Sequence, residues 1–268
     1  AYRRQRQMCI RDRVGEVVSV IGEEMMSGGL QGYLITKSFA DEYGIWTLED
    51  LDNNADAIAA YDATDANPGN GMVDIMGCPE DWTCDNIINS QLAFAGYKNL
   101  QQVKAGYDPM WAQAVDMVNE GLPVVAYTWT PSAYITQIRP GDNAYWLGME
   151  AILDDSNPMG QDGGEGWDQR PGTAAISEDQ CPARSADGMC PIGWKAADIR
   201  AAANNDFLAA NPAAEELLKQ ITFSVMEISL ANVAQGEGAD PKDLAADWIA
   251  DNRSKVDGWL DAARAAAG

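Results

Sequence analysis

The chain has 268 residues, with 41 acidic and 18 basic side chains, no histidine and a formal net charge of -23. Its hydrophobic fraction of 46% suits a globular protein with a sizeable core, in one domain or in two lobes. The acidic excess argues against nucleic acid, whose phosphates bind Lys and Arg. Without histidine, Ser-His-Asp and Cys-His catalysis cannot occur within this chain, and the commonest metal ligand is missing. We expect no metal and no cofactor.

The first 13 residues differ in charge from all that follows. They carry five of the 18 basic residues and only one acidic residue, which leaves a net charge of -27 for the remainder. A signal peptide would need an apolar stretch, which this segment lacks. We predict that residues 1–13 are a non-native tail, resembling translated sequencing adapter, rather than a basic arm that binds anions. Native sequence is then expected to begin near Val14.

Strands and helices alternate along the next 135 residues, which predicts an α/β protein. Apolar runs predict strands, and caps followed by amphipathic runs predict helices. The predicted strands cover 14–21, 31–36, 123–128 and 143–149, with a Gly-rich turn at 27–29. The predicted helices begin at Thr47, Asp85, Asp108-Pro109 and Thr130-Pro131, and the second and third end near Tyr97 and Gly121.

The last part of the chain changes in composition. Residues 152–191 are rich in Gly, Asp, Pro and Ser and are expected to form a long loop region. From Lys195 to the end the sequence predicts helices only, with starts at Asn211-Pro212 and Asp240-Pro241. No fixed-period repeat is present, and no run of 18 apolar residues predicts a membrane-spanning helix.

Four of the five cysteines form two close pairs, Cys78/Cys84 and Cys181/Cys190, while Cys9 is left over. Zinc sites usually have tighter spacings and often a histidine. Disulfides are therefore favoured over free or metal-bound thiols, and they imply an oxidising compartment such as a periplasm or the cell exterior.

Two tryptophans stand out from the nine in the chain. Trp82 lies between two cysteines, just before the helix that begins at Asp85, so an indole face for a cation would lie beside helix amides for an anion. Trp129 ends a predicted strand, where ligands of open α/β sheets bind. Their alternative role is core packing, which we expect for the other tryptophans in amphipathic helical contexts, Trp46, Trp111, Trp248 and Trp259.

Oxygen-rich side chains also gather in the predicted loop 62–74. They resemble a calcium loop in composition, but the bidentate Glu and the EF-hand spacing are absent, so a simple turn is the favoured interpretation. Pairs of acidic residues could in principle catalyse a reaction, but with 41 acidic residues they carry little information.

Several motifs occur in the same order in one known family. They are Gly32-Tyr-Leu-Ile, Gly77-Cys-Pro-Glu-Asp-Trp-Thr-Cys84, Tyr127-Thr-Trp-Thr-Pro131, Asn211-Pro-Ala-Ala and Val256-Asp-Gly-Trp259. From about Val14 onward the chain resembles the glycine betaine/proline betaine-binding proteins of osmoprotectant ABC importers. The resemblance implies a two-lobe α/β periplasmic binding protein fold of type II that closes on its ligand.

The resemblance also implies the roles of the site residues. Trp82 and Trp129 would be two walls of an aromatic box around a quaternary ammonium, the backbone amides of Thr83 and Cys84 would bind the carboxylate, and the Cys78–Cys84 disulfide would hold the loop. Binding would involve no catalysis, and the partner would be a membrane permease. The location would be periplasmic, or extracellular and tethered to the membrane through that partner.

The chain departs from the family pattern at its start. About the first third of the family sequence, with a further box tryptophan and a histidine that contacts the carboxylate, has no counterpart here. We therefore expect an intact second lobe at 34–147 and an incomplete first lobe formed by 14–33 and 148–268, with Cys181–Cys190 as a local staple. The alternative function is a secreted, disulfide-containing hydrolase that uses carboxylates in an aromatic-lined cleft.

Overall fold

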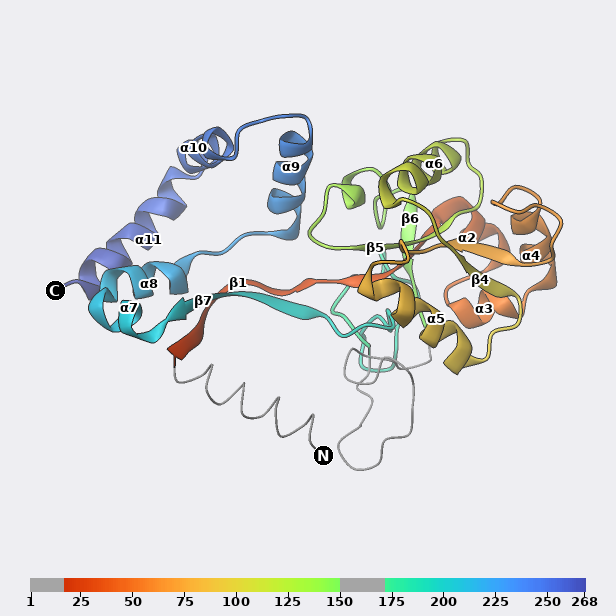
Figure 1. Cartoon of the computed structure of the whole chain (residues 1–268), viewed down its shortest axis with the longest axis horizontal. Coiled ribbons are helices and arrows are strands. Elements are labelled where there is room, and N and C mark those ends of the chain that lie inside the picture. Colours follow the sequence, from red (N-terminus) through yellow and green to blue (C-terminus); the bar gives the residue numbers. More distant parts are fainter. Residues whose placement is uncertain (1–16, 150–171) are drawn as a thin grey trace, which may run out of the picture. The chain divides into compact units, whose positions relative to one another are not determined.

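The structure is a computed structural model that describes residues 17–149 and 172–268 (Figure 1). These residues divide into two compact units, Leu30–Ala196 and a smaller unit formed by 17–29 with Ala197–Gly268. The described part of 148–196, which we expected in the first lobe, thus lies in the same compact unit as 34–147. The predicted tail, Cys9 and residues 152–171 of the predicted loop region lie outside the described residues. Within the described ranges, no helix has the length and apolar character needed to cross a membrane.

The larger unit is built on a five-stranded mixed sheet with the order β4-β3-β5-β2-β6. Its strands are β2 (Gln31–Thr36), β3 (Val73–Met76), β4 (Leu100–Val103), β5 (Val125–Trp129) and β6 (Ala144–Leu147). Strand β3 runs parallel to β4 and β5, whereas β2 pairs antiparallel with β5 and β6. The predicted α/β class is confirmed. Strands β3 and β4, of four residues each, were not predicted from the sequence.

Five α-helices and a short 3-10 helix complete the larger unit. They are α2 (Lys37–Tyr43), α3 (Leu48–Asp52), α4 (Ala55–Asp62), α5 (Thr83–Ala95), α6 (Tyr107–Asn119) and η1 (Tyr134–Thr136). The capping box predicted at Thr47 is present, with Asp50 as its partner. Helix α6 begins at Tyr107, two residues earlier than predicted, with Gly106 rather than Asp108 as N-cap. Pro109 fits in its first turn because an amide there has no partner within the helix. The helix predicted after Pro131 is wrong, since only η1 follows.

The core of this unit ties the strands to the helices. Tyr61 on α4 is 1% exposed, and its hydroxyl accepts a hydrogen bond from the Val125 amide at 2.7 Å and donates one to the Asp74 carbonyl at 3.1 Å. One side chain therefore connects α4 to both β5 and β3. Trp111 is 4% exposed and belongs to this core, as predicted, and Trp46 packs against the core from a partly buried position.

The smaller unit contains a two-stranded antiparallel sheet and five helices. Its elements are β1 (Val18–Gly29), β7 (Ala197–Asn204), α7 (Asn205–Ala210), α8 (Pro212–Gln220), α9 (Val225–Gly236), α10 (Pro241–Asp251) and α11 (Arg253–Ala266). The helix starts at Pro212 and Pro241 are confirmed. Two predictions are wrong. Strand β1 runs through the expected turn at 27–29 by way of register shifts and a positive φ at Ser27. Residues 197–204 are a strand, because pairing with β1 overrides the helix propensity of their alanines.

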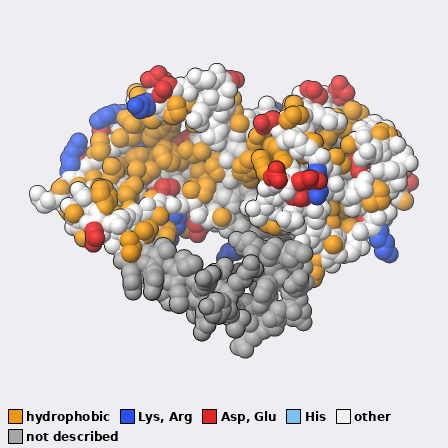
Figure 2. All heavy atoms as spheres, in the orientation of Figure 1, with side chains coloured by type: hydrophobic (Ala, Val, Ile, Leu, Met, Phe, Trp, Pro, Cys, Tyr) orange, Lys and Arg blue, Asp and Glu red, His pale blue; other side chains and the backbone are white. Residues whose placement is uncertain are grey.

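Helices α8 to α11 enclose an apolar groove of about 640 Å³, and Figure 2 shows hydrophobic side chains gathered over these helices. Trp248 and Trp259 line it, stacked at 5.8 Å between ring centroids. Both are only partly buried, so the core position predicted for them holds in part. The Nζ atom of Lys255 lies over both rings, at 5.5 and 5.3 Å from their centroids. A cation of the chain itself thus already uses these indole faces.

Candidate functional site

The pairing of β3 with β5 places both candidate tryptophans at one edge of the sheet. The two strands are parallel, and Met76 pairs with Ala126. The chain leaves β3 directly into the cysteine loop, and β5 ends at Trp129. Since the carboxyl ends of parallel strands meet at the same edge, Trp82 and Trp129 come together although 47 positions separate them. Their ring centroids lie 5.7 Å apart, in an edge-to-face arrangement.

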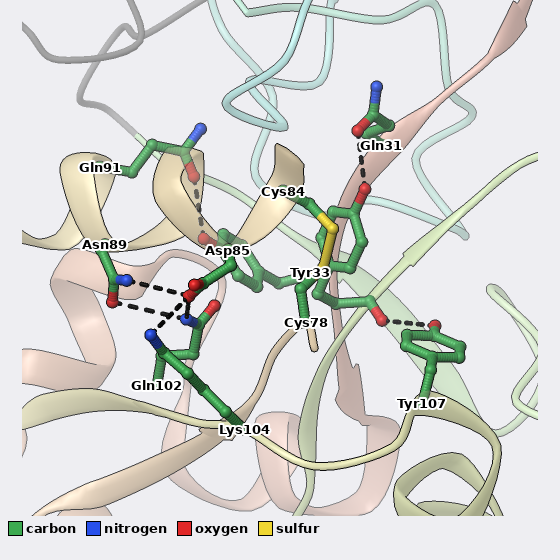
Figure 3. The surroundings of a disulfide bond; sticks show 11 residues. Gln31, Tyr33, Cys78, Cys84, Asp85, Asn89, Gln91, Gln102, Lys104 and Tyr107 are labelled. Atoms are coloured by element: carbon green, nitrogen blue, oxygen red, sulfur yellow. Dashed lines mark hydrogen bonds and ion pairs between the residues drawn. A yellow bond between two sulfur atoms is a disulfide. The ribbon is translucent and has the colours of Figure 1, made fainter. Parts of the chain in front are cut away.

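The predicted Cys78–Cys84 disulfide is present and closes the loop that carries Trp82 (Figure 3). The two Cα atoms are 6.0 Å apart, within the usual range for a disulfide. The Trp82 amide donates a hydrogen bond to the Pro79 carbonyl at 3.0 Å, which adds a turn inside the covalent ring. A loop held in both ways has few conformations left, so the indole is presented in a fixed place.

Trp82 is the N-cap residue of α5, with extended backbone angles and no side-chain capping bond. Helix N-caps are normally Ser, Thr, Asp or Asn, whose oxygens accept a bond from the first amides. The indole cannot do so, and it is 40% exposed. A position that breaks a local stability rule in this way is typical of a functional site.

Trp129 is held from both sides of its backbone. The Ser132 hydroxyl donates to the Trp129 carbonyl at 2.7 Å. The next residue, Thr130, donates its amide to the Leu30 carbonyl at 2.9 Å and accepts a bond from the Leu30 amide on its Oγ1 at 3.0 Å. The Thr130–Pro131 peptide is cis. These bonds fix where the strand ends and hence where its indole lies.

Three further rings surround the two tryptophans and were not predicted as site residues. Tyr107 stacks on Trp82, with centroids 5.4 Å apart and an angle of 17° between planes. It also packs against Trp129 at 5.0 Å, against Tyr134 at 4.8 Å and, on its other face, against Trp111 at 5.9 Å. Tyr134 in turn lies 5.2 Å from Trp129. The aromatic wall is therefore Trp82, Tyr107, Trp111, Trp129 and Tyr134.

The sequence offered one signal for the missed tyrosines. Each lies close to a proline-marked boundary, Tyr107 two residues before Pro109 and Tyr134 three residues after Pro131. A second aromatic group supports the wall from within, because Trp194 packs on Tyr127 at 5.5 Å and Tyr127 lies 6.2 Å from Trp129.

The phenols of the wall, and that of Tyr127 which supports it, are hydrogen-bonded and neutral. Tyr107 donates to the Tyr127 carbonyl at 2.8 Å, and Tyr127 donates to Gln31 Oε1 at 2.7 Å. Burial raises the pKa of both phenols well above the usual value. Burial, with the hydrogen bond to Asp108 at 2.6 Å, raises the pKa of Tyr134 to about 12. The wall thus keeps uncharged rings whose π-faces attract a cation.

The amides of Thr83 and Cys84 begin α5 beside the Trp82 ring. The first amides of an α-helix have no partner inside the helix, and among the described residues no acceptor binds these two. Their dipoles add to the positive end of a 13-residue helix, which attracts an anion. The structure therefore has an aromatic face next to helix amides that have no acceptor among the described residues, as the sequence predicts. That these residues bind a ligand remains a prediction.

Asp85 follows directly in the first turn of α5 and is 5% exposed. Its Oδ1 atom receives Lys104 Nζ at 2.8 Å, Gln102 Nε2 at 2.5 Å and Asn89 Nδ2 at 3.0 Å. Figure 3 shows the three donors converging on this carboxylate to one side of the disulfide. The buried charge is thus paired, and it joins α5 to β4 and to the residue that follows β4.

The other predicted features have separate outcomes. Cys181 and Cys190 form the second disulfide, as predicted, with Cα atoms 6.1 Å apart. In the loop 62–74, Asp62 accepts hydrogen bonds from the amides of Gly69, Asn70 and Gly71. The oxygens of this carboxylate therefore stabilise the conformation of the loop. Within 17–149 and 172–268, no group of three or more His, Cys, Asp or Glu side chains is placed to hold a metal ion.

The alternative of a hydrolase required two carboxylates between the tryptophans. The described ring neighbours of Trp82 and Trp129 are aromatic. Asp108 reaches the aromatic wall through its bond to the Tyr134 hydroxyl. The described contacts of the aromatic wall give the alternative of a hydrolase no support.

Comparison with known sequences identifies a matching family. The family described as the substrate binding domain of ABC-type glycine betaine transport system matches residues 7–251. The glycine betaine-binding periplasmic protein OusX of Dickeya dadantii is 29% identical over 247 residues, which is 90% of this chain and 67% of that protein. The glycine betaine/proline betaine-binding periplasmic protein of Escherichia coli is 28% identical over 90% of this chain and 66% of its own length. The chain spans about two thirds of these relatives.

Comparison with solved structures shows the fold. An ABC-transporter choline binding protein in complex with choline superposes with a TM-score of 0.51 at 17% identity, over 96% of this chain and 75% of that one. The glycine betaine, L-proline-binding protein ProX from Borrelia burgdorferi gives a TM-score of 0.51 at 11% identity, over 92% of this chain and 71% of its own. The chain has the type II periplasmic binding protein fold.

Proposed function

Because this chain belongs to the family of substrate-binding domains of ABC-type glycine betaine transport systems, we propose that it binds a quaternary ammonium zwitterion. Glycine betaine is the ligand named for its relative in Dickeya dadantii, and glycine betaine and proline betaine are those named for its relative in Escherichia coli. The protein would deliver the ligand to a membrane permease in the periplasm and would catalyse no reaction.

The aromatic wall supports the cationic half of this proposal. A trimethylammonium group has no hydrogen to donate, so it gains little from polar partners and is best bound by aromatic faces that exclude water, at about 2 kcal/mol or more per desolvated contact. The 40% exposed ring of Trp82, with Trp129 edge-to-face beside it, provides such faces. Tyr107 and Tyr134 hold the two indoles in place.

The start of α5 supports the anionic half. The Thr83 and Cys84 amides lie next in the chain to Trp82, so one rigid loop would meet both ends of a short zwitterion. Neutral amide donors at a helix start can bind a carboxylate without a free lysine. We assign the lobe that carries this loop to residues 34–147 at least, and we expect the facing wall of the site to come from the other lobe.

The observation that carries the proposal is the contact between Trp82 and Trp129 at the amino end of α5. Isothermal titration calorimetry with glycine betaine tests it, on this chain and on a fusion that adds the part of the Escherichia coli relative that this chain does not cover. We expect saturable binding that Trp129→Ala abolishes. If neither protein binds glycine betaine, proline betaine or choline, the proposal is wrong.

A further inference from the structure

We propose that Lys104 is a specificity-determining residue of this site. By neutralising the buried Asp85 it keeps the start of α5 receptive to a carboxylate, so that the site favours zwitterions over plain cations. This inference rests on the proposed function for its ligand, although its electrostatic part can be tested without any ligand.

The geometry shows why one lysine matters. The Asp85 side chain is 7% exposed, and the Lys104 side chain is 30% exposed. Gln102 and Asn89 bind the same oxygen, but amides orient a carboxylate without cancelling its charge. Among the described residues, Lys104 is the positive side chain that reaches Asp85. The buried carboxylate therefore depends on a single cation for its neutralisation.

The surrounding sequence makes this dependence stronger. Between Cys78 and Asp85 the chain has three acidic residues, Glu80, Asp81 and Asp85, and no basic residue. Glu80 and Asp81 are exposed, so water and salt screen them. Asp85 is buried, one residue after the proposed carboxylate ligand Cys84, and its charge is screened much less.

A structural role for Asp85 is the competing explanation. An acidic residue in the first turn stabilises a helix by itself, through the helix dipole, and this needs no lysine. A ligand carboxylate bound to the Thr83 and Cys84 amides would, however, bring a second negative charge to the same helix end. Two carboxylates at one site repel each other, and the ion pair with Lys104 removes most of that repulsion.

Gly77 leaves the space that this network needs. A Cβ atom at this position would lie 2.4 Å from the Cγ and Oε1 atoms of Gln102. Any larger residue would therefore displace the amide that holds Asp85 beside Lys104. The glycine before Cys78 thus contributes to the charge balance behind the site as well as to the loop.

Calorimetry with a matched pair of ligands tests the specificity. Glycine betaine and choline share the trimethylammonium group, but only glycine betaine has a carboxylate. We expect Lys104→Met to weaken glycine betaine binding roughly tenfold by an uncompensated charge, with choline binding unchanged or stronger. Asp85→Asn should change the ratio of the glycine betaine affinity to the choline affinity in the opposite direction. The double variant should restore the wild-type ratio. Equal losses for both ligands would indicate a structural role and overturn the inference.

Lys98→Met is the matched control, because it removes the same charge beyond the other end of α5. A helix of 13 residues is about 20 Å long, which exceeds the screening length of about 8–10 Å at moderate salt. We expect Lys98→Met to leave the ratio of the glycine betaine affinity to the choline affinity unchanged. A change as large as that of Lys104→Met would mean that net charge alone is at work, and would overturn the inference.

A second measurement needs no ligand and separates this inference from the proposed function. Anionic and cationic nitroxide cosolutes broaden amide resonances in proportion to their local concentration, so their ratio at the Thr83 amide reports the potential there. We expect Lys104→Met to lower the anion-to-cation ratio and Asp85→Asn to raise it. An unchanged ratio in both variants refutes the inference even if glycine betaine binds. A shifted ratio in a chain that binds no quaternary ammonium supports the electrostatic role and refutes the proposed function instead.

Discussion

Replacing Trp82 by alanine separates a cation–π contact from ordinary packing. In the structure one face of this indole rests on Tyr107 at 5.4 Å, while 40% of the residue stays exposed. A desolvated cation–π contact contributes about 2 kcal/mol, so Trp82→Ala should weaken glycine betaine binding about 30-fold. The lost packing, on the order of 100 Å² of buried ring, should also lower the free energy of unfolding by about 2–3 kcal/mol.

The assay compares two ligands of the same shape. In 3,3-dimethylbutanoate a carbon replaces the nitrogen of glycine betaine, so the size and the carboxylate stay while the positive charge disappears. Calorimetry on the wild-type protein should show weaker binding of this anionic isostere, whose tert-butyl group has no charge. Trp82→Ala should then reduce the affinity for glycine betaine far more than that for the isostere, and Trp82→Phe should give an intermediate loss.

Phe94→Ala is the control for the loss of an exposed aromatic side chain on the same helix. Phe94 is 47% exposed near the end of α5, far from the loop, and its removal should leave both affinities unchanged. The reasoning is refuted if Trp82→Ala weakens both ligands by the same factor, because the ring would then act as a hydrophobic wall only. It is also refuted if a folded Trp82→Ala protein binds glycine betaine as well as the wild type does.

Three further predictions concern the frame of the site. The double replacement of Cys78 and Cys84 by Ser should lower the free energy of unfolding by about 2 kcal/mol, through the entropy of the opened loop, and an unchanged urea midpoint would contradict this. Tyr61→Phe should cost about 1–3 kcal/mol by leaving the Val125 amide buried without an acceptor, visible as faster hydrogen exchange at that amide. Tyr134 has a folded pKa of about 12, above the unfolded value of about 10, so its stabilisation is complete below pH 10 and is lost toward pH 12. Tyr134→Phe should flatten the fall of Tm in that range, and an unaltered profile would show that other groups cause it.

Local patterns in the sequence predicted the local structure well. The helix starts marked by Thr47, Pro212 and Pro241 are set by neighbours within four positions, and the structure confirms each start. The apolar runs that become β2 and β5 are buried, and their burial selects the strand. The two disulfides were likewise predictable, because each joins cysteines fewer than ten positions apart.

Pairing over long distances in the sequence explains most of the errors. Residues 197–204 include three consecutive alanines, which favour a helix on their own, yet they pair with β1, from Val18↔Asn204 to Gly29↔Ala197, far apart in the sequence. Strands β3 and β4 have four residues each and gain their stability from neighbours in the sheet rather than from their own pattern. A short segment of sequence does not show which distant strand it will pair with.

The same dependence on pairing separates the predicted part of the site from the part that was missed. The cysteine spacing shows that Trp82 lies in a constrained loop, but the register of Met76 with Ala126 decides that the loop meets the end of β5. Once that register is fixed, the chain after β4 enters α6 at Tyr107, whose ring then fills the space between Trp82 and Trp111. Tyr107 is 5% exposed, so it orients the indole without being the surface that a ligand would meet. For a tyrosine of this kind the nearby proline marks a helix boundary but does not indicate the role of the ring, because that role is defined by the partners that the sheet brings to its two faces.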